Sequence, residues 1–151
     1  MGGSPELAYS DLIRKEILQQ GLNQNVSLLG QRLDVAAILK ACDVGVLSST
    51  SETCPLALLE YGMAGLPAVA TNVGQCAEVL DEGRAGILVP SGSPDQLAEA
   101  LLSLLQSPQR RSALGQRLRR QVQERYSPGP VMEQVCRVYE KVLSSKKRLC
   151  Q

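Results

Sequence analysis

Short apolar runs alternate with stretches of helical character along residues 5–89. Four runs have the length and composition of strands: 26–30, 44–48, 68–70 and 87–89. The stretches between them carry helical spacing or helix start and stop residues: 5–20, 35–42, 55–64 and 75–80. This alternation predicts an α/β fold with a doubly wound parallel sheet of about four strands.

Local signals define several of these helices. Asp34 is placed to cap the helix over residues 35–42, and Pro55 stands at the first position of the next helix, with Gly65 just past its end. In the first helix the spacing predicts one buried face, formed by Leu7, Leu12, Ile13, Glu16 and Ile17.

After residue 89 the pattern is helical only. Ser93 and Ser107 are placed to cap the first two of three predicted helices: 94–105, 108–125 and 130–147. The length of 151 residues fits one domain. We therefore expect a single domain over 1–151, with 94–147 as its C-terminal helical part; residues 1–4 read as an expression scar or the remnant of a strand.

Composition excludes several kinds of chemistry. The chain has no histidine, so it contains neither a Ser-His-Asp nor a Cys-His nucleophile and no His-ligated zinc. Its 5 cysteines never have C-x-x-C spacing, which predicts reduced thiols, no metal and a cytoplasmic location. No apolar run is long enough to span a membrane, so a soluble or peripheral protein is expected.

Charge is unevenly distributed. Residues 1–107 hold 5 Lys and Arg against 12 Asp and Glu, whereas residues 108–151 hold 11 against 3. A series of arginines such as that in residues 108–125 usually forms a solvent-exposed helix face. The alternative is contact with an anionic membrane surface. Nucleic acid is not an expected partner, because the chain has no Phe or Trp and only 4 Tyr to stack on bases.

Two carboxylates stand in the mostly apolar segment at 51–67. Glu52 follows the run at 44–48, where ligands bind in open α/β sheets, and Glu60 lies within the next helix, which is apolar nearly all round and is expected to be buried. Free backbone N–H groups near Cys54 and Leu56 suit a phosphate, and a carboxylate suits the two hydroxyls of a ribose. Together they indicate a nucleotide-sugar. In the alternative reading, Glu52 only stabilises the helix dipole and Glu60 pairs with a buried Arg or Lys.

The segment SETCPLALLEYGMAGLPAVATNVG at 51–74 resembles the donor-site signature of the retaining GT-B glycosyltransferases of the family-4 type, the glycosyl transferases group 1. Their pattern is Glu, seven residues, Glu, a turn with Gly-Leu-Pro, an apolar strand and a Thr-x-x-Gly turn. The flanking motifs agree in order: VSLLG at 26–30, ACDV at 41–44, GRAGILVP at 83–90, SPD at 93–95 and RYS at 125–127.

This resemblance implies a Rossmann-like donor domain that takes part in sugar transfer with retention, without a metal or other cofactor. It implies that Glu52 contacts hydroxyls of the donor sugar as the catalytic-site residue and that Glu60 contacts the ribose. Backbone groups of the intervening residues would line the sugar and pyrophosphate: Thr53, Cys54, Pro55 and Leu56. The turn beside the nucleobase would comprise Gly30, Gln31, Arg32 and Leu33.

The chain also departs from the family pattern. Thr53 and Cys54 replace the usual Gly and aromatic residue, and Gln75 replaces the second Gly of the Thr-x-x-Gly-Gly turn. The first strand–helix unit of the donor domain, with its Arg and Lys, and the acceptor-binding N-terminal domain have no counterpart before residue 5. The expected partners are a nucleotide-sugar and a complementary acceptor domain. Two functions stay open: the donor-binding part of a glycosyltransferase, inactive when isolated, or a non-catalytic nucleotide-sugar-binding module.

Overall fold

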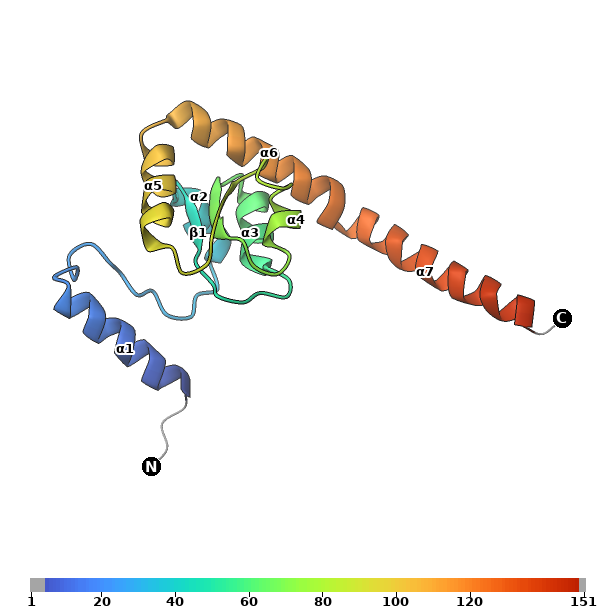
Figure 1. Ribbon diagram of the computed structural model, residues 1–151, viewed down its shortest axis with the longest axis horizontal. Helices are drawn as coiled ribbons and strands as arrows, with labels where there is room; N and C mark the ends of the chain where they lie inside the picture. The colour runs from blue at the N-terminus through green and yellow to red at the C-terminus, as the bar shows by residue number, and fades with distance from the viewer. Residues whose placement is uncertain (1–4, 150–151) are drawn as a thin grey trace. The chain divides into compact units, whose positions relative to one another are not determined.

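The computed structural model describes residues 5–149 in two compact units, Met1–Leu33 and Asp34–Gln151. The first unit contains helix α1, Pro5–Gln19, followed by a turn and an irregular segment (Figure 1). Residues 1–4, expected as a scar or strand remnant, and Cys150 lie outside the described residues. The expectation that residues 1–151 form a single domain stays a proposal.

A parallel sheet forms the centre of the second unit. Its strands are β1 (Gly45–Leu47), β2 (Ala68–Thr71) and β3 (Ile87–Val89), in the order β1-β2-β3. Both strand pairs are parallel, with Val46 opposite Val69 and Ala70 opposite Leu88. The predicted parallel α/β sheet is confirmed.

The prediction of a strand at 26–30 is wrong, and the described sheet has three strands. Residues 26–30 have no regular structure, and Val26, Leu28 and Leu29 are 40%, 48% and 58% exposed. A strand requires a neighbouring strand for its backbone N–H and C=O groups, and the described residues supply none to this segment. Apolar character alone therefore led to the wrong assignment.

The described part of the second unit contains six helices: α2 (Val35–Ala41), α3 (Leu56–Ala64), α4 (Cys76–Val79), α5 (Pro94–Leu105), α6 (Pro108–Tyr126) and α7 (Pro128–Leu149). Each overlaps a predicted helix. Gly65 ends α3 in the left-handed conformation, and the Ser107 hydroxyl accepts a hydrogen bond from the Arg110 N–H as the α6 cap. Asp34 and Ser93 stand at cap positions without a side-chain cap bond.

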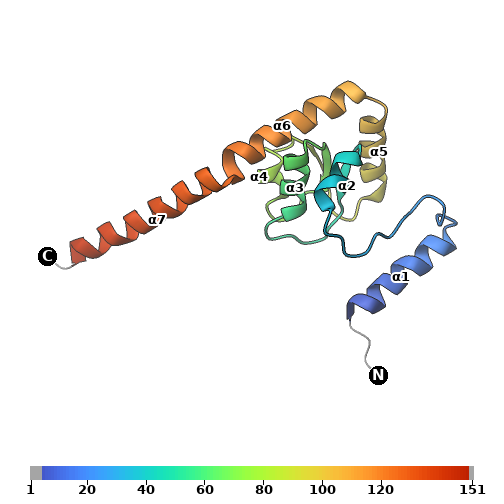
Figure 2. The same ribbon diagram turned by 180° about the vertical axis from the view of Figure 1, so that it is seen from behind.

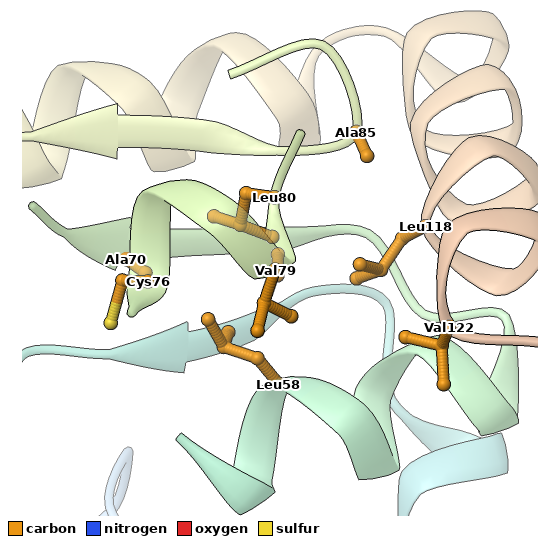
Figure 3. Packing of buried hydrophobic residues seen from close by; sticks show 9 residues of the cluster. Leu58, Ala70, Cys76, Val79, Leu80, Ala85, Leu118 and Val122 are labelled. Carbon is orange, nitrogen blue, oxygen red and sulfur yellow. The ribbon is translucent and has the colours of Figure 1, made fainter. Parts of the chain in front are cut away.

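One core lies between the sheet and helices α3, α4 and α6. Leu58 of α3, Val79 of α4 and Leu118 of α6 converge there (Figure 3). Ala68 and Ala70 supply the sheet side of this cluster. Their small side chains let the helices approach the central strand closely.

The opposite face of the sheet packs on α5. Val69 and Val89 meet Ala100 and Leu104 in a second cluster. Ala68 and Ala70 face one cluster and Val69 the other, as the two-residue period of a strand requires. Figure 2 shows α5 on one side of the sheet and α3 with α4 on the other, the doubly wound arrangement predicted.

Helices α3 and α6 cross closely because two glycines lie at the contact. A Cβ on Gly62 would stand 2.5 Å from Val122 Cγ2, and a Cβ on Gly115 would overlap the Gly65 carbonyl oxygen. This crossing holds the middle of α6 against the C-terminal end of α3 and so fixes the position of α3, the helix that follows the Glu52 loop.

The predicted buried face of α1 is not formed in the first unit. Leu12 is 62% exposed, Glu16 is exposed, and Ile13 and Ile17 are partly buried. The side chain of Leu7 lies outside the described residues. Helical spacing predicts the helix but does not supply the surface that would cover it.

Candidate functional site at the carboxyl end of the sheet

The loop between β1 and α3, residues 48–55, carries the first candidate residue (Figure 1). Glu52 is half-buried in this loop, and its Oε1 atom accepts a hydrogen bond of 2.6 Å from the Ser49 hydroxyl. Because β1 runs into this loop, Glu52 lies beyond the carboxyl end of the strand, where open α/β sheets bind ligands.

The last residue of β2 is hydrogen-bonded to the same loop. Thr71 is 4% exposed, and its hydroxyl lies 2.5 Å from the Ser49 carbonyl oxygen and 3.4 Å from that of Leu47. The shorter distance identifies the Ser49 carbonyl as the main acceptor. The loop after β1 is therefore attached to the central strand.

Gly74 completes the contact from the loop after β2. Its φ is +50°, and a Cβ placed there would overlap the Glu52 backbone carbonyl oxygen. Only glycine combines this conformation with so close an approach. The Thr71-x-x-Gly74 turn thus packs directly against the backbone of Glu52.

The start of α3 offers fewer free donors than predicted. Pro55 is buried at the N-cap, and the N–H of Leu56 donates to the Cys54 carbonyl at 2.9 Å, so this N–H is not free. Within the described part of the chain, the N–H groups of Thr53, Cys54 and Ala57 make no hydrogen bond. Three donors therefore remain at the helix start, none of them at Leu56.

Glu60 is exposed, which corrects the expectation of a buried helix around it. Leu58 and Gly62 form the buried face of α3, while Leu56 and Met63 are 65% and 58% exposed on the face that carries Glu60. The helix is apolar on both faces, but the described residues cover only one. Apolar composition by itself does not determine burial.

The turn predicted beside the nucleobase belongs to the first unit. Gly30, Gln31, Arg32 and Leu33 are all exposed, and Gly30 has a positive φ of +63°. Glu52 belongs to the second unit, so the placement of this turn beside a nucleobase stays a prediction.

The end of α6 lies near the start of α3. The pKa of Tyr126 is raised by burial, then by the negative charge of Glu78, with a further contribution from Cys54, the residue before Pro55. The Tyr126 hydroxyl is buried and makes no hydrogen bond of good geometry within residues 5–149. The RYS motif at 125–127 is thus close to the helix start that the resemblance assigns to the donor.

Two cavities of the second unit, one at each end of the described sheet, lie away from Glu52. A cavity of about 150 Å³ at the carboxyl end of the sheet is lined by Ser48, Thr71, Gly92, Ser93, Pro94 and Leu97. A larger one of about 530 Å³ lies at the opposite end, where Gly86 enters β3 beside Arg110 and Arg117 of α6. Small-molecule sites usually measure about 300–1,000 Å³. Size favours the larger cavity, but none of the predicted donor residues lines it, so we place the candidate site on the open surface around Glu52.

The described residues contain neither a cluster for a metal ion nor a membrane-spanning helix. No group of three or more of their His, Cys, Asp or Glu side chains could hold a metal ion, and none of their helices is long and apolar enough to cross a membrane. The four cysteines within residues 5–149 are free: Cys42, Cys54, Cys76 and Cys136.

Ser49 is the site residue that sequence reasoning missed. Its signal is a hydroxyl three residues before Glu52, a separation that a short loop can close with a side-chain hydrogen bond. Thr71 and Gly74 belong to the Thr-x-x-Gly motif of the sequence, but their contacts with the Glu52 loop appear only in the folded chain.

Comparison with known proteins identifies the class to which this fold and loop belong. The family model of glycosyl transferases group 1 matches residues 1–107. The chain therefore belongs to the glycosyl transferases group 1, and the resemblance stated from the motifs is confirmed.

Two relatives illustrate the membership. The chain is 30% identical over 126 residues to N-acetyl-alpha-D-glucosaminyl L-malate synthase of Bacillus anthracis, covering 83% of this chain and 33% of the relative. It is 35% identical over 131 residues to phosphatidyl-myo-inositol mannosyltransferase of Mycobacterium leprae, covering 83% and 34%. The chain thus spans about a third of the length of these relatives.

Solved structures show the same fold. Sucrose-phosphate synthase of Thermosynechococcus elongatus superposes with a TM-score of 0.84 at 25% identity, over 95% of this chain and 37% of that chain. Anabaena HepE in complex with UDP superposes with a TM-score of 0.86 at 23% identity, over 92% and 38%. HepE has also been solved with UDP-glucose. The Rossmann-like α/β assignment is confirmed.

Proposed function

We propose that this chain is the donor-binding part of a retaining glycosyltransferase and that it binds a nucleotide-sugar at the carboxyl end of β1 and β2. The observation that carries the proposal is the position of Glu52, held by Ser49 next to the start of α3. A carboxylate beside free N–H groups offers acceptors for sugar hydroxyls and donors for a pyrophosphate.

The roles follow the family likeness and the local chemistry. Glu52 would contact the donor sugar, the free N–H groups of Thr53 and Cys54 the pyrophosphate, and Glu60 the ribose. The exposure of Glu60 leaves its carboxylate accessible to a ligand. Pro55 and Leu56 would contribute contact surface only, since Pro55 has no N–H and that of Leu56 is already bonded.

The turn formed by Gly30, Gln31, Arg32 and Leu33 is proposed to lie beside the nucleobase. The relatives' UDP complexes support a nucleotide ligand for this fold. No metal or other cofactor is proposed. A cytoplasmic location is proposed from the free thiols, and a peripheral membrane contact through residues 108–125 from their excess of arginine.

We expect the isolated chain to bind the donor weakly and to transfer no sugar. Transfer requires an acceptor held against the donor, a stabilised leaving group and exclusion of water. The proposed contacts on this chain involve the donor only. A complementary acceptor domain is therefore the proposed partner. The alternative is a non-catalytic binding module, which would also transfer no sugar.

Calorimetry and ligand-observed NMR with common nucleotide-sugars test the proposal. Glu60→Gln replaces a charged acceptor by an amide, so binding is expected to weaken by about 1–3 kcal/mol. Glu99→Gln on α5 is the matched control, because Glu99 is exposed and makes no ion pair in the described structure. Equal affinities for both variants would contradict the role of Glu60, and robust transfer by the purified chain would contradict the expected inactivity.

A further inference from the structure

The direction of the Glu52 side chain is not set by regular secondary structure. Residues 48–55 belong to neither a helix nor a strand. A glutamate in such a loop has several rotatable bonds, and holding it in one rotamer costs conformational entropy. Any fixed orientation of its carboxylate must come from specific contacts.

Ser49 provides one such contact. Its hydroxyl donates to Glu52 Oε1 at 2.6 Å, the short distance of a charge-assisted O–H···O bond. The other carboxylate oxygen has no hydrogen-bond partner within residues 5–149. One oxygen is therefore held by the protein while the second is free for a ligand hydroxyl.

Thr71 holds Ser49 in turn. The Thr71 hydroxyl donates to the Ser49 backbone carbonyl, and Thr71 itself is paired with Val89 in the sheet. Since Thr71 is 4% exposed, this bond is shielded from water. The chain of contacts runs from the central strand through Ser49 to the Glu52 carboxylate.

Gly74 supports the same loop from another side. Its close approach to the Glu52 carbonyl limits movement of the Glu52 backbone, while Ser49 limits rotation of the side chain. Backbone and carboxylate are thus held by two separate elements, the turn after β2 and the loop after β1.

We propose that Ser49 and Thr71 are positioning residues that orient the Glu52 carboxylate toward the donor. The inference rests on the proposed function, because the orientation matters for binding only if Glu52 contacts the donor sugar. In this proposal both residues act through Glu52, because the Ser49 hydroxyl is bonded to its carboxylate and the Thr71 hydroxyl to the Ser49 carbonyl. Their effect is to present Oε2 of Glu52 in one direction before the donor arrives.

The test uses paired variants of the full chain. Ser49→Ala and Thr71→Val remove one hydroxyl each, whereas Ser49→Thr and Thr71→Ser retain it. Ser51→Ala is the matched control, since Ser51 is exposed, adjoins Glu52 and makes no hydrogen bond in the described structure. Side-chain ¹³C relaxation and χ1 couplings report the order of Glu52, and NMR titration with UDP-glucose reports affinity.

We expect averaged Glu52 rotamers in Ser49→Ala and Thr71→Val, and a single rotamer in the native chain and the other three variants. Affinity for UDP-glucose should fall roughly 3- to 10-fold in the two hydroxyl-deleted variants. An ordered Glu52 in Ser49→Ala, or rotamer loss with unchanged affinity, would overturn the inference. A native chain that binds no UDP-glucose contradicts the proposed function for this donor instead, and the rotamer comparison then still decides whether Ser49 and Thr71 orient Glu52.

Discussion

Gly74 faces the backbone carbonyl of Glu52 so closely that a single methyl group on Gly74 would overlap the carbonyl oxygen. Both residues lie beyond the carboxyl ends of neighbouring strands, Glu52 after β1 and Gly74 after β2. The contact makes the second loop a support for the first. Local conformation and tertiary packing thus impose the same requirement for glycine at this position.

Gly74→Ala tests this support. We expect it to lower the free energy of unfolding and to disorder the Glu52 loop. Gly83→Ala is the matched control, because Gly83 also has a positive φ, +87°, but nothing lies within 4 Å of its Cβ position. Both variants carry the backbone strain of roughly 1–2 kcal/mol, and the overlap should add about 1–3 kcal/mol for Gly74 alone. If Gly74→Ala and Gly83→Ala lower the free energy of unfolding equally in urea denaturation, the close contact between Gly74 and the Glu52 loop adds nothing to stability.

The α3–α6 crossing predicts coupling between Gly62 and Val122. Gly62→Ala improves helix propensity by about 1 kcal/mol, but its Cβ meets the buried, β-branched Val122, so a net loss of roughly 1–3 kcal/mol is expected. Val122→Ala should recover much of that loss in the double variant. A urea denaturation double-mutant cycle measures the coupling.

Gly115→Ala is the control for this cycle. Its Cβ would meet the Gly65 backbone instead of a side chain, so Val122→Ala should not relieve it. If Val122→Ala relieves both glycine substitutions equally, the crossing is loosened as a whole and the specific contact is refuted.

Two partly buried tyrosines differ in their hydroxyl groups. The Tyr61 hydroxyl donates to the Val46 carbonyl at 3.0 Å, whereas the Tyr126 hydroxyl makes no hydrogen bond of good geometry in the described structure. Tyr61→Phe should therefore cost about 1 kcal/mol at pH 7, and Tyr126→Phe should be neutral or stabilising. Thermal unfolding of the two variants, compared with the native chain, measures the difference.

The same residues predict sensitivity to alkaline pH. Burial, followed by nearby Glu60 for Tyr61 and Glu78 for Tyr126, raises the pKa of both groups above the ordinary value of about 10. As the pH rises, these tyrosines lose their protons in the unfolded chain before they do so in the folded chain. Their contribution to the free energy of unfolding is therefore complete below about pH 10 and falls as the pH rises further. Each Phe variant should reduce that fall, and an unchanged slope in both would contradict the assignment.

The basic surface of α6 predicts salt-sensitive binding to anionic vesicles. Arg119 and Arg120 are exposed and form no ion pair within residues 5–149. Their joint replacement by Glu should lower the partition constant by at least roughly 30-fold in sedimentation assays, at about 1 kcal/mol per basic residue. Lys15→Glu with Lys40→Glu changes the net charge equally and should have less effect. Equal binding to neutral vesicles would exclude the electrostatic contact.

The order of strands and helices in the second unit was readable from the chain, because each of its elements has a local cause. Pro94 and Ser107 mark helix starts, Gly65 permits the left-handed turn that ends α3, and the apolar residues of β2 form a strand covered on both faces. Such signals involve residues that are neighbours in sequence, so they can be recognised without knowledge of the fold. The family motifs are also local patterns and can be recognised in the same way.

Only the tertiary structure determines which predicted strands are paired and which helix faces are buried. The run at 26–30 has strand composition but no partner strand, and the apolar helix α3 has one covered face and one exposed face, with Glu60 on the latter. The attachment of Glu52 to Ser49, Thr71 and Gly74 joins residues from separate loops. Burial and hydrogen bonding depend on what lies opposite in space, and that is determined only when distant segments of the chain come together.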